Sequence, residues 1–333
     1  MEVACHLVGS GWTYDQLKSA WQEIEELGFD SCYTGDDIFT HHMDGIPHPD
    51  ADGFVFETWT VLTAMAATTD RMRIGPLVSP CGRRHPVLLA KMSSAVDIIS
   101  SGRLTLGMGA GNSPAQYRSM GIPFLKPAER TVRLREELHV IRSMWTQERT
   151  TFLGEYYQVE DAINSPKPVQ QPHPEILVAY QGKKYLPGVA AEFADRVNLL
   201  GADDSRVMMA MDALEEKCRE QGRDFGRIVK GRIACIVFTD EEVQPQDIHR
   251  AIRQRAIEIS FDPDELVEEL EEYLLPYVGP ASGCAEALKK RTADLGFQEI
   301  VITIDNWGLN SYDRTIEGFR KFAKEVMPKL REY

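Results

Sequence analysis

The sequence predicts one α/β domain, a (β/α)8 barrel over residues 1–333. Eight short apolar segments with the character of strands alternate with helical segments along the chain. Such alternation implies parallel strands joined by crossover helices, and eight of them over 333 residues favour a closed barrel. An open, doubly wound sheet is the alternative fold. A content of 43% hydrophobic and 26% charged residues is typical of a globular protein and calls for no second domain.

The first half of the chain is expected to supply four strands. Thr13 and Gln16 form a capping-box pattern before a helical repeat that ends at Gly28, and Pro86 suits the first turn of another helix. Residues 35–56 show no periodicity and are rich in Asp, His, Pro and Gly, so a long functional loop is expected there. The expected strands are 2–8, 30–34, 72–78 and 103–107, and a helix is expected over 57–69.

Strands and helices also alternate in the second half of the chain. Residues 150–159 predict a hairpin that turns near Gly154. The other expected strands are 176–180, 196–199, 231–238 and 299–304. Helices are expected over 133–145, 182–194, 205–221, 282–295 and 312–330, with an acid-rich helix in much of 246–277.

Charge and cysteine content exclude several classes of function. A formal charge of −14 disfavours nucleic acid, whose phosphates would be repelled, and no apolar run is long enough to predict a membrane span. The six cysteines are scattered without a CxxC pair, so neither a metal site nor a disulfide framework is indicated, and a reducing cytoplasm is expected. The opening MEVACHLV predicts a first strand and not a signal peptide.

Residues at the carboxyl ends of the strands are the candidates for chemistry, since that face of a barrel carries the active site. Gly107, Gly109 and Gly111 alternate and leave one face without side chains, which suits a flat cofactor; a glycine turn without a ligand is the alternative. His6 points into either the mouth or the barrel core. The candidates are His6, Asp36, Asp37, Val78, Ser79, Asn112, Gln181 and Asn306.

Two short basic segments are candidate anchors. The run YQGKK, residues 180–184, leads from a strand into an expected helix N-terminus, where free N–H groups and the helix dipole favour a phosphate. Lys183 and Lys184 either add positive charge there or are solvated surface residues. Arg83, Arg84 and His85 follow the third strand as anchors for a cofactor tail or a loop, with a structural role favoured.

Several segments together resemble the bacterial luciferase-like family, specifically its F420-dependent oxidoreductase branch. The resemblance covers about the first two thirds of the chain and keeps the order of the family. The segments are GFDSCYTGDD, TDRMRIGPLVSPCGRRHPVLLAK, DIISSGRLTLGMGAGN, YRSMGIPF, FLGEYYQVEDAINSPKPVQQPHPEILVAYQG and VAAEFADRVN. The fold of this family is a (β/α)8 barrel with insertions at the carboxyl face of the strands, in agreement with the strand count.

The resemblance implies a flavin-like ring over the barrel mouth, with substrate on its open face. It implies a non-proline cis peptide bond between Leu77 and Val78 beneath the ring, and a phosphate turn at Gln181 and Gly182. The implied cofactor contacts are Leu77, Val78, Ser79, Gly109, Ala110, Gly111, Asn112, Tyr180, Gln181, Gly182, Lys183 and Lys184. Relatives are often homodimers, so a homodimer acting on a small molecule is expected.

The catalytic residues implied by the resemblance are Asp36, Asp37, Asn112 and His6. The family frequently has Asp-His where this chain has Asp36 and Asp37, which are either a proton-donating pair, solvated loop carboxylates or a helix cap. Asn112 stands where several relatives carry Glu; its amide can hydrogen-bond a carbonyl but cannot deliver a proton.

Three functions follow as hypotheses. The first is an F420-dependent oxidoreductase that transfers hydride between the deazaflavin C5 and a small organic substrate. The second is an FMN-dependent monooxygenase of the same family. The third is a non-catalytic barrel that only binds flavin or uses the glycine-rich seat for contact with a partner, favoured by the absence of the family's His and Glu at positions 37 and 112.

Overall fold

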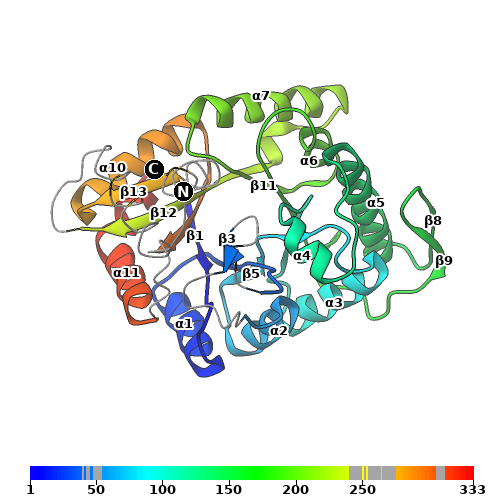
Figure 1. Cartoon of the computed structure of the whole chain (residues 1–333), viewed down its shortest axis with the longest axis horizontal. Helices are drawn as coiled ribbons and strands as arrows, with labels where there is room; N and C mark the ends of the chain where they lie inside the picture. The colour runs from blue at the N-terminus through cyan, green and yellow to red at the C-terminus, as the bar shows by residue number, and fades with distance from the viewer. Residues whose placement is uncertain are drawn as a thin grey trace.

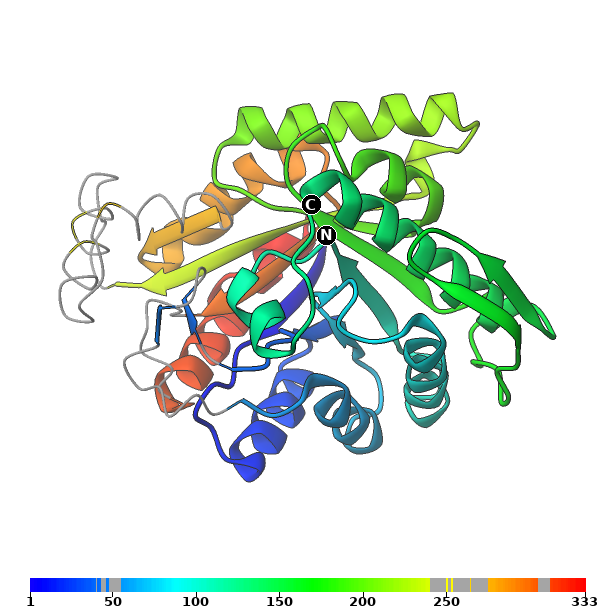
Figure 2. The ribbon, with the colours of Figure 1, turned by 45° about the vertical axis from the view of Figure 1, so that its right-hand side comes forward.

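A parallel β-barrel wrapped by helices forms the body of the protein in the computed structural model (Figures 1 and 2). The structure describes residues 1–39, 41–42, 46–47, 55–239, 250, 253, 264, 275–304 and 312–333. Within these ranges the barrel strands are β1 (Glu2–Leu7), β2 (Ser31–Thr34), β5 (Arg73–Pro76), β7 (Thr105–Gly109), β10 (Glu175–Tyr180), β11 (Arg196–Leu199), β12 (Val229–Phe238) and β14 (Glu299–Ile304).

These strands pair in the order β5-β2-β1-β14-β12-β11-β10-β7. Ile74 of β5 forms a parallel bridge with Leu104, which directly precedes β7. The backbone N–H of Ile74 also donates to the carbonyl of Arg103 at 3.0 Å. The ends of the sheet therefore meet, which confirms the (β/α)8 barrel and excludes the open sheet.

Helices lie on the outside of the barrel, between successive strands or after the last one. They are α1 (Tyr14–Glu26), α2 (Thr58–Thr68), α3 (Pro86–Ile99), α5 (Pro127–Thr146), α6 (Pro187–Phe193), α7 (Asp204–Glu220), α10 (Ala281–Arg291), α11 (Tyr312–Glu325) and α12 (Met327–Arg331). The capping box before α1 is confirmed: Thr13 Oγ1 accepts from Gln16 N at 3.3 Å and Gln16 Oε1 accepts from Thr13 N at 2.9 Å. Both views place the two chain termini side by side.

Several short strands and one short helix are added to the barrel and its outer helices. The predicted hairpin is confirmed as β8 (Thr150–Leu153) and β9 (Gln158–Ala162), which project from the body (Figure 1). The buried carboxylate of Glu136 holds its turn by accepting from the backbone N–H groups of residues 155, 156 and 157. Within the predicted loop 35–56, β3 (His41–His42) pairs with β4 (Ile46–Pro47). A short α4 (Pro114–Ser119) follows β7, and β6 (Ser79–Pro80) follows β5.

Two predicted helices are wrong in part. The helix expected over 182–194 begins only at Pro187, because Gly182 has a left-handed φ of 72° and the proline ring suits the first helical position. The end of the acid-rich helix expected within 246–277 is the strand β13 (Leu275–Gly279), which pairs with the outer half of β12. Most of the rest of that expected helix lies outside the described residues.

Two apolar clusters lie on either side of the barrel wall. The larger one fills the space between strands and helices and contains the buried rings of Trp21, Trp59, Phe319 and Phe322. The smaller cluster fills the barrel interior with Ala4, Tyr33, Leu177, Ala179, Ile233 and Val301. Leu77, Val78 and Leu200 pack against this interior cluster. We call these three residues the apolar floor.

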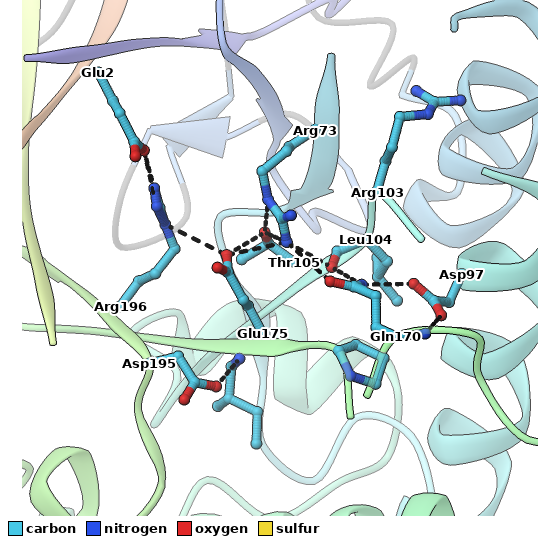
Figure 3. Close-up of polar contacts among 12 residues, drawn as sticks. Glu2, Arg73, Asp97, Arg103, Leu104, Thr105, Gln170, Glu175, Asp195 and Arg196 are labelled. Carbon is cyan, nitrogen blue, oxygen red and sulfur yellow. Dashed lines mark hydrogen bonds and ion pairs between the residues drawn. The ribbon is translucent and has the colours of Figure 1, made fainter. Parts of the chain in front are cut away.

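Ion pairs tie the strands together near their amino ends (Figure 3). The Arg196 side chain, 3% exposed, pairs with Glu2, with Glu175 at 3.7 Å and with the fully buried Glu299 at 3.8 Å. Glu175 also pairs with Arg73 at 3.0 Å. These residues come from five different strands. The network therefore stabilises the closed barrel as a whole and not one pair of neighbouring strands.

The described helices include none that is long and apolar enough to cross a lipid bilayer. All six cysteines are buried and unpaired.

Candidate active site at the barrel mouth

A bulge interrupts the third barrel strand at the carboxyl face. β5 ends at Pro76, β6 begins at Ser79, and the Leu77–Val78 peptide bond between them is cis, which confirms the resemblance at this point. A Cβ on Gly107 would lie 1.9 Å from the Pro76 carbonyl oxygen, and one on Gly109 would lie 2.6 Å from Val78 Cγ2. The bulge itself therefore occupies the space where Gly107 and Gly109 have no side chain. A contact between Gly109 and a cofactor stays a prediction.

Asp36 is buried and fully engaged with the protein. Its carboxylate accepts from Ser79 Oγ at 2.6 Å and makes a bidentate pair with Arg84, at 2.5 and 3.0 Å. Ser79 in turn accepts from Trp59 Nε1 at 3.0 Å. Arg84 also pairs with Glu57 at 2.5 Å, and Arg83 donates to the Asp36 carbonyl. The two arginines therefore anchor the loop after β2, as the structural interpretation expected.

Asp37, by contrast, is exposed beside that anchor. Gln116 of α4, itself fully buried, donates to Asp37 Oδ1 at 2.8 Å and accepts from Ile38 N at 3.2 Å. The adjacent carboxylates therefore differ: the Asp36 side chain is locked in place, whereas the Asp37 side chain is exposed. Asn112 is also exposed, in the segment between β7 and α4.

His6 lies at the carboxyl end of β1, where it lines a pocket of about 70 Å³. Its neighbours there include Thr34, Gly35 and Asp37 from β2 and the following loop, and we call this space the β1–β2 pocket. His6 Nε2 is buried and has no hydrogen-bond partner among the described residues. Burial lowers the pKa of His6 to about 4, so the ring is neutral at pH 7. His6 is therefore not a core histidine with satisfied hydrogen bonds.

A larger pocket of about 310 Å³ opens at the carboxyl ends of β10 and β11. Its lining, which defines the β10–β11 pocket, consists of Gln181, Gly182, Lys183, Leu200, Gly201, Asp203, Arg206 and Met209. Gln181 and Gly182 line it from an irregular segment and not from a helix N-terminus, since α6 begins at Pro187. Lys184 is exposed with its ammonium 4.9 Å from the Tyr185 ring centroid. The Tyr180 hydroxyl donates to the Ala210 carbonyl of α7, so its ring points away from the mouth.

Buried charge supports the far wall of the β10–β11 pocket. Arg232 of β12 is fully buried and donates to the carbonyls of Gly201 and Ala202, at 2.8 and 3.3 Å. It also pairs with Asp204 at 2.6 Å, and Arg291 contacts the same carboxylate at 3.0 Å. These contacts fix the start of α7, whose N-cap is Asp203.

The structure brings the predicted residues together in two groups at opposite sides of the barrel. His6 and Asp37 share the β1–β2 pocket, and Gln181, Gly182 and Lys183 share the β10–β11 pocket. His85 caps α3 by accepting from Val87 N, which is a structural role. Asn306 lies outside the described residues.

Sequence reasoning missed the residues after β11 and the supporting residues Gln116 and Arg232. The signal for Leu200, Gly201, Asp203 and Arg206 was their place directly after a predicted barrel strand. No local pattern marked Gln116 or Arg232, because their roles depend on partners distant in the sequence.

Fold and site together define a (β/α)8 barrel with two pockets at the carboxyl ends of its strands. Residues 1–299 match the sequence profile of the family described as luciferase-like monooxygenase. The chain belongs to this family of oxidoreductases.

Individual relatives use two kinds of cofactor. An F420-dependent glucose-6-phosphate dehydrogenase from Microbacterium testaceum is 26% identical over 92% of this chain and 91% of its own length. An FMNH(2)-dependent dimethylsulfone monooxygenase from Pseudomonas putida is 28% identical over 60% of this chain and 54% of its own length. Among solved structures, an F420-dependent secondary alcohol dehydrogenase in complex with an F420-acetone adduct superposes with a TM-score of 0.78 at 18% identity, covering 99% of both chains.

Proposed function

We propose that the protein is an F420-dependent oxidoreductase that transfers hydride between the deazaflavin C5 and a small organic substrate. The observation that carries this proposal is the continuity of the apolar floor with the β10–β11 pocket: Leu200 belongs to both. A flat ring needs an apolar surface to lie on, and its polar tail needs a polar pocket at the edge of that surface.

The residues present fit such a cofactor. Leu77 and Val78 would support the ring, while Lys183 and Arg206 would offer positive charge to an anionic tail in the β10–β11 pocket. Gly182 and Gly201 would let the tail approach the backbone closely, since neither carries a side chain. Bound there, F420 would supply the hydride donor or acceptor. The chain would hold the ring against the floor and exclude water from beneath it.

The resemblance to the F420-dependent branch and the F420-dependent relative that spans nearly the whole chain support this cofactor over FMN. The FMN-dependent relative keeps the monooxygenase as the second candidate. The two cofactors differ in charge: the F420 tail is polyanionic, whereas FMN carries one phosphate.

The test is to titrate F420 and FMN separately into cofactor-free protein and to follow fluorescence and the thermal midpoint. We expect F420 to stabilise the folded state by about 2.7 kcal/mol at a hundredfold excess over its dissociation constant. Its affinity should weaken more steeply with salt than that of FMN, because more charge is screened.

Arg206→Met should reduce that salt dependence, whereas Arg149→Met, directly before the projecting hairpin, is the matched control that should not. Tight binding of FMN without any response to F420 would favour the monooxygenase. A response to neither cofactor would favour the non-catalytic barrel.

A further inference from the structure

One buried carboxyl group connects the β8–β9 hairpin to the loop that follows β6. Glu137 of α5 is 1% exposed, and its Oε1 accepts from Gly82 N at 2.5 Å and from the Tyr157 hydroxyl. Arg133, one helical turn earlier in α5, has its Nε 4.0 Å from the same oxygen. This single oxygen therefore joins α5 to both segments.

The backbone around Gly82, which we call the Gly82 turn (residues 81–83), depends on these contacts. Gly82 has a left-handed φ of 80°, and its carbonyl accepts from Arg133 Nη2 at 3.2 Å. Arg133 Nε also donates to the Tyr157 hydroxyl at 2.9 Å. A Cβ on Gly82 would lie 2.2 Å from Arg133 Cζ, so the turn requires glycine for space as well as for conformation. Two side chains of α5 thus hold both polar groups of the Gly82 backbone.

Tyr117 connects the Gly82 turn to the barrel mouth. Its hydroxyl donates to the Cys81 carbonyl at 2.5 Å, next to Gly82 in the chain. Tyr117 belongs to α4 and is 1% exposed, and a Cβ on Gly111 would lie only 2.4 Å from its hydroxyl oxygen. Gly111 directly precedes Asn112, a candidate site residue at the mouth. A movement of the Gly82 turn therefore shifts a side chain that packs against this part of the mouth.

The surroundings of Glu137 act in opposite directions on its charge. Burial disfavours the ionised form, whereas the hydrogen bonds from Tyr157 and Gly82 and the charge of Arg133 favour it. The balance places the pKa of Glu137 at about 7. The group therefore changes charge near neutral pH, with its acceptor oxygen bound to the Gly82 turn.

The neighbouring titratable groups have to be separated from Glu137. Burial raises the pKa of the Tyr157, Tyr117 and Cys81 side chains, so all three stay neutral near pH 7. The positive charges that face these side chains come from Arg83, Arg130 and Arg133. His85, before α3, packs edge-on against the Tyr157 ring at 5.6 Å between centroids, and histidine is the side chain that ordinarily titrates near neutral pH.

We propose that Glu137 is a positioning residue for the barrel mouth: its ionised form holds the Gly82 turn firmly and thereby fixes Tyr117 against Gly111. A hydrogen bond to an ionised acceptor is roughly twice as strong as one between neutral groups. Protonation below pH about 7 therefore loosens the Gly82 turn, and the packing of Tyr117 at the mouth loosens with it. A consequence for cofactor binding rests on the proposed function, whereas the coupling between the turn and the mouth does not.

The test uses the full, cofactor-free chain, isotope-labelled on the glycine nitrogen and on the carbonyl carbon of either cysteine or alanine. Cys81–Gly82 is the only Cys-Gly pair in the sequence and Ala110–Gly111 the only Ala-Gly pair, so each combination of labels reports one amide. NMR follows both amides from two pH units below the pKa of Glu137 to two units above it. We expect the resonances of Gly82 and Gly111 to shift together, with one midpoint near pH 7.

Three variants make the outcome specific. Glu137→Gln keeps the shape of the side chain but cannot ionise, so both amides should become independent of pH. Tyr117→Phe removes only the hydroxyl that binds the Cys81 carbonyl, so Gly82 should still titrate while the Gly111 shift falls to less than half of its size in the parent. His85→Asn keeps a residue that can cap α3 and should leave both midpoints unchanged.

Failure of either amide to titrate near pH 7 in the parent would overturn the proposal, and so would a full Gly111 shift in Tyr117→Phe. A titration that persists in Glu137→Gln, or that disappears in His85→Asn, would belong to another group and would overturn it as well. Because the experiment contains no cofactor, its result is separate from the F420 titration: failure to bind F420 would refute the proposed function and leave these amide shifts unchanged.

Discussion

Two adjacent carboxylates show how the structure separates roles that the sequence left equal. Asp36 is buried, with both oxygens engaged by Arg84 and Ser79. Asp37 is exposed, and Gln116 orients only one of its oxygens. The bidentate pair with Arg84 holds the Asp36 carboxylate in place as a structural partner, so Asp37 stays the candidate of the two for a catalytic role and Asp36 supports it.

Asp36→Asn should lower the free energy of unfolding by about 3 kcal/mol, because Arg84 would lose its buried partner. Asp37→Asn should change it by less than about 0.5 kcal/mol, as is usual for an exposed position. Chemical denaturation of both variants measures the difference. Equal losses in the two variants would contradict the separation of roles.

Glu137 predicts a pH dependence of stability. Burial raises its pKa to about 7, against hydrogen bonds from Tyr157 and Gly82 and the charge of Arg133 that favour the ionised form. The folded protein therefore binds this proton more tightly than the unfolded chain. The stabilising contribution is present below pH about 4.5 and is lost as the pH rises to about 7.

Glu137→Gln removes this titration. Relative to the parent, the variant should gain up to about 3 kcal/mol of stability between pH 4.5 and pH 8. Unfolding free energies measured at both ends of this range test it, with substitution of the exposed Glu216 as control. A difference between variant and parent that stays constant with pH would exclude a titrating Glu137.

At the scale of elements, the mouth is shaped by the close approach of β5 and β7. The glycines of β7 allow the Leu77–Val78 bulge to lie against the strand, which places Leu77 and Val78 on the apolar floor. On the other side of the barrel, Arg232 draws the loop after β11 toward β12 and so opens the β10–β11 pocket at the start of α7.

Gly107→Ala should destabilise the protein by about 3 kcal/mol, because its Cβ would overlap the Pro76 carbonyl and push β7 away from the bulge. Gly188→Ala is the control, since its Cβ would meet only Arg135 Nη2, at 3.6 Å, and alanine favours the helix by up to about 1 kcal/mol. Thermal midpoints of the two variants should move in opposite directions. A neutral Gly107→Ala would mean that the bulge is free to shift.

At the scale of the molecule, barrel closure depends on residues from opposite ends of the chain. β1 lies between β2 and β14, and Arg196 joins Glu2 to Glu175 (Figure 3). Arg196 also pairs with Glu299. The homodimer, the cytoplasmic location and the lack of nucleic-acid partners stay predictions, and light scattering of the purified chain tests the first.

Arg196→Met should cost about 3–5 kcal/mol at neutral pH, because Glu299 would be left buried without its cationic partner. Arg149→Met breaks an exposed pair with Asp161 and should cost less than about 1 kcal/mol. Urea denaturation of both variants compares the two losses. A similar, small cost for both would show that the network does not hold the barrel closed.

The positions and order of the strands could be predicted from the sequence alone. Apolar strands that alternate with amphipathic helices form a local sequence pattern, and a compact chain with this pattern folds as a parallel sheet covered by helices. All eight barrel strands lie within about two residues of their expected bounds, and the capping box, the β8–β9 hairpin and the Leu77–Val78 bond agree as well. The start of α6 was misplaced, since its position depends on the left-handed turn at Gly182 and on Pro187.

The different roles of the site residues could be assigned only from the tertiary structure. Whether Asp36 or Asp37 is locked depends on Arg84 and Gln116, which lie 48 and 79 positions along the chain from those carboxylates. Likewise, the β1–β2 pocket exists only because the pairing of these two strands brings His6 beside Thr34 and Gly35. The local sequence pattern shows which side chains stand at the end of a strand. Burial, pairing and free space are properties of contacts between distant segments, and only the folded chain decides them.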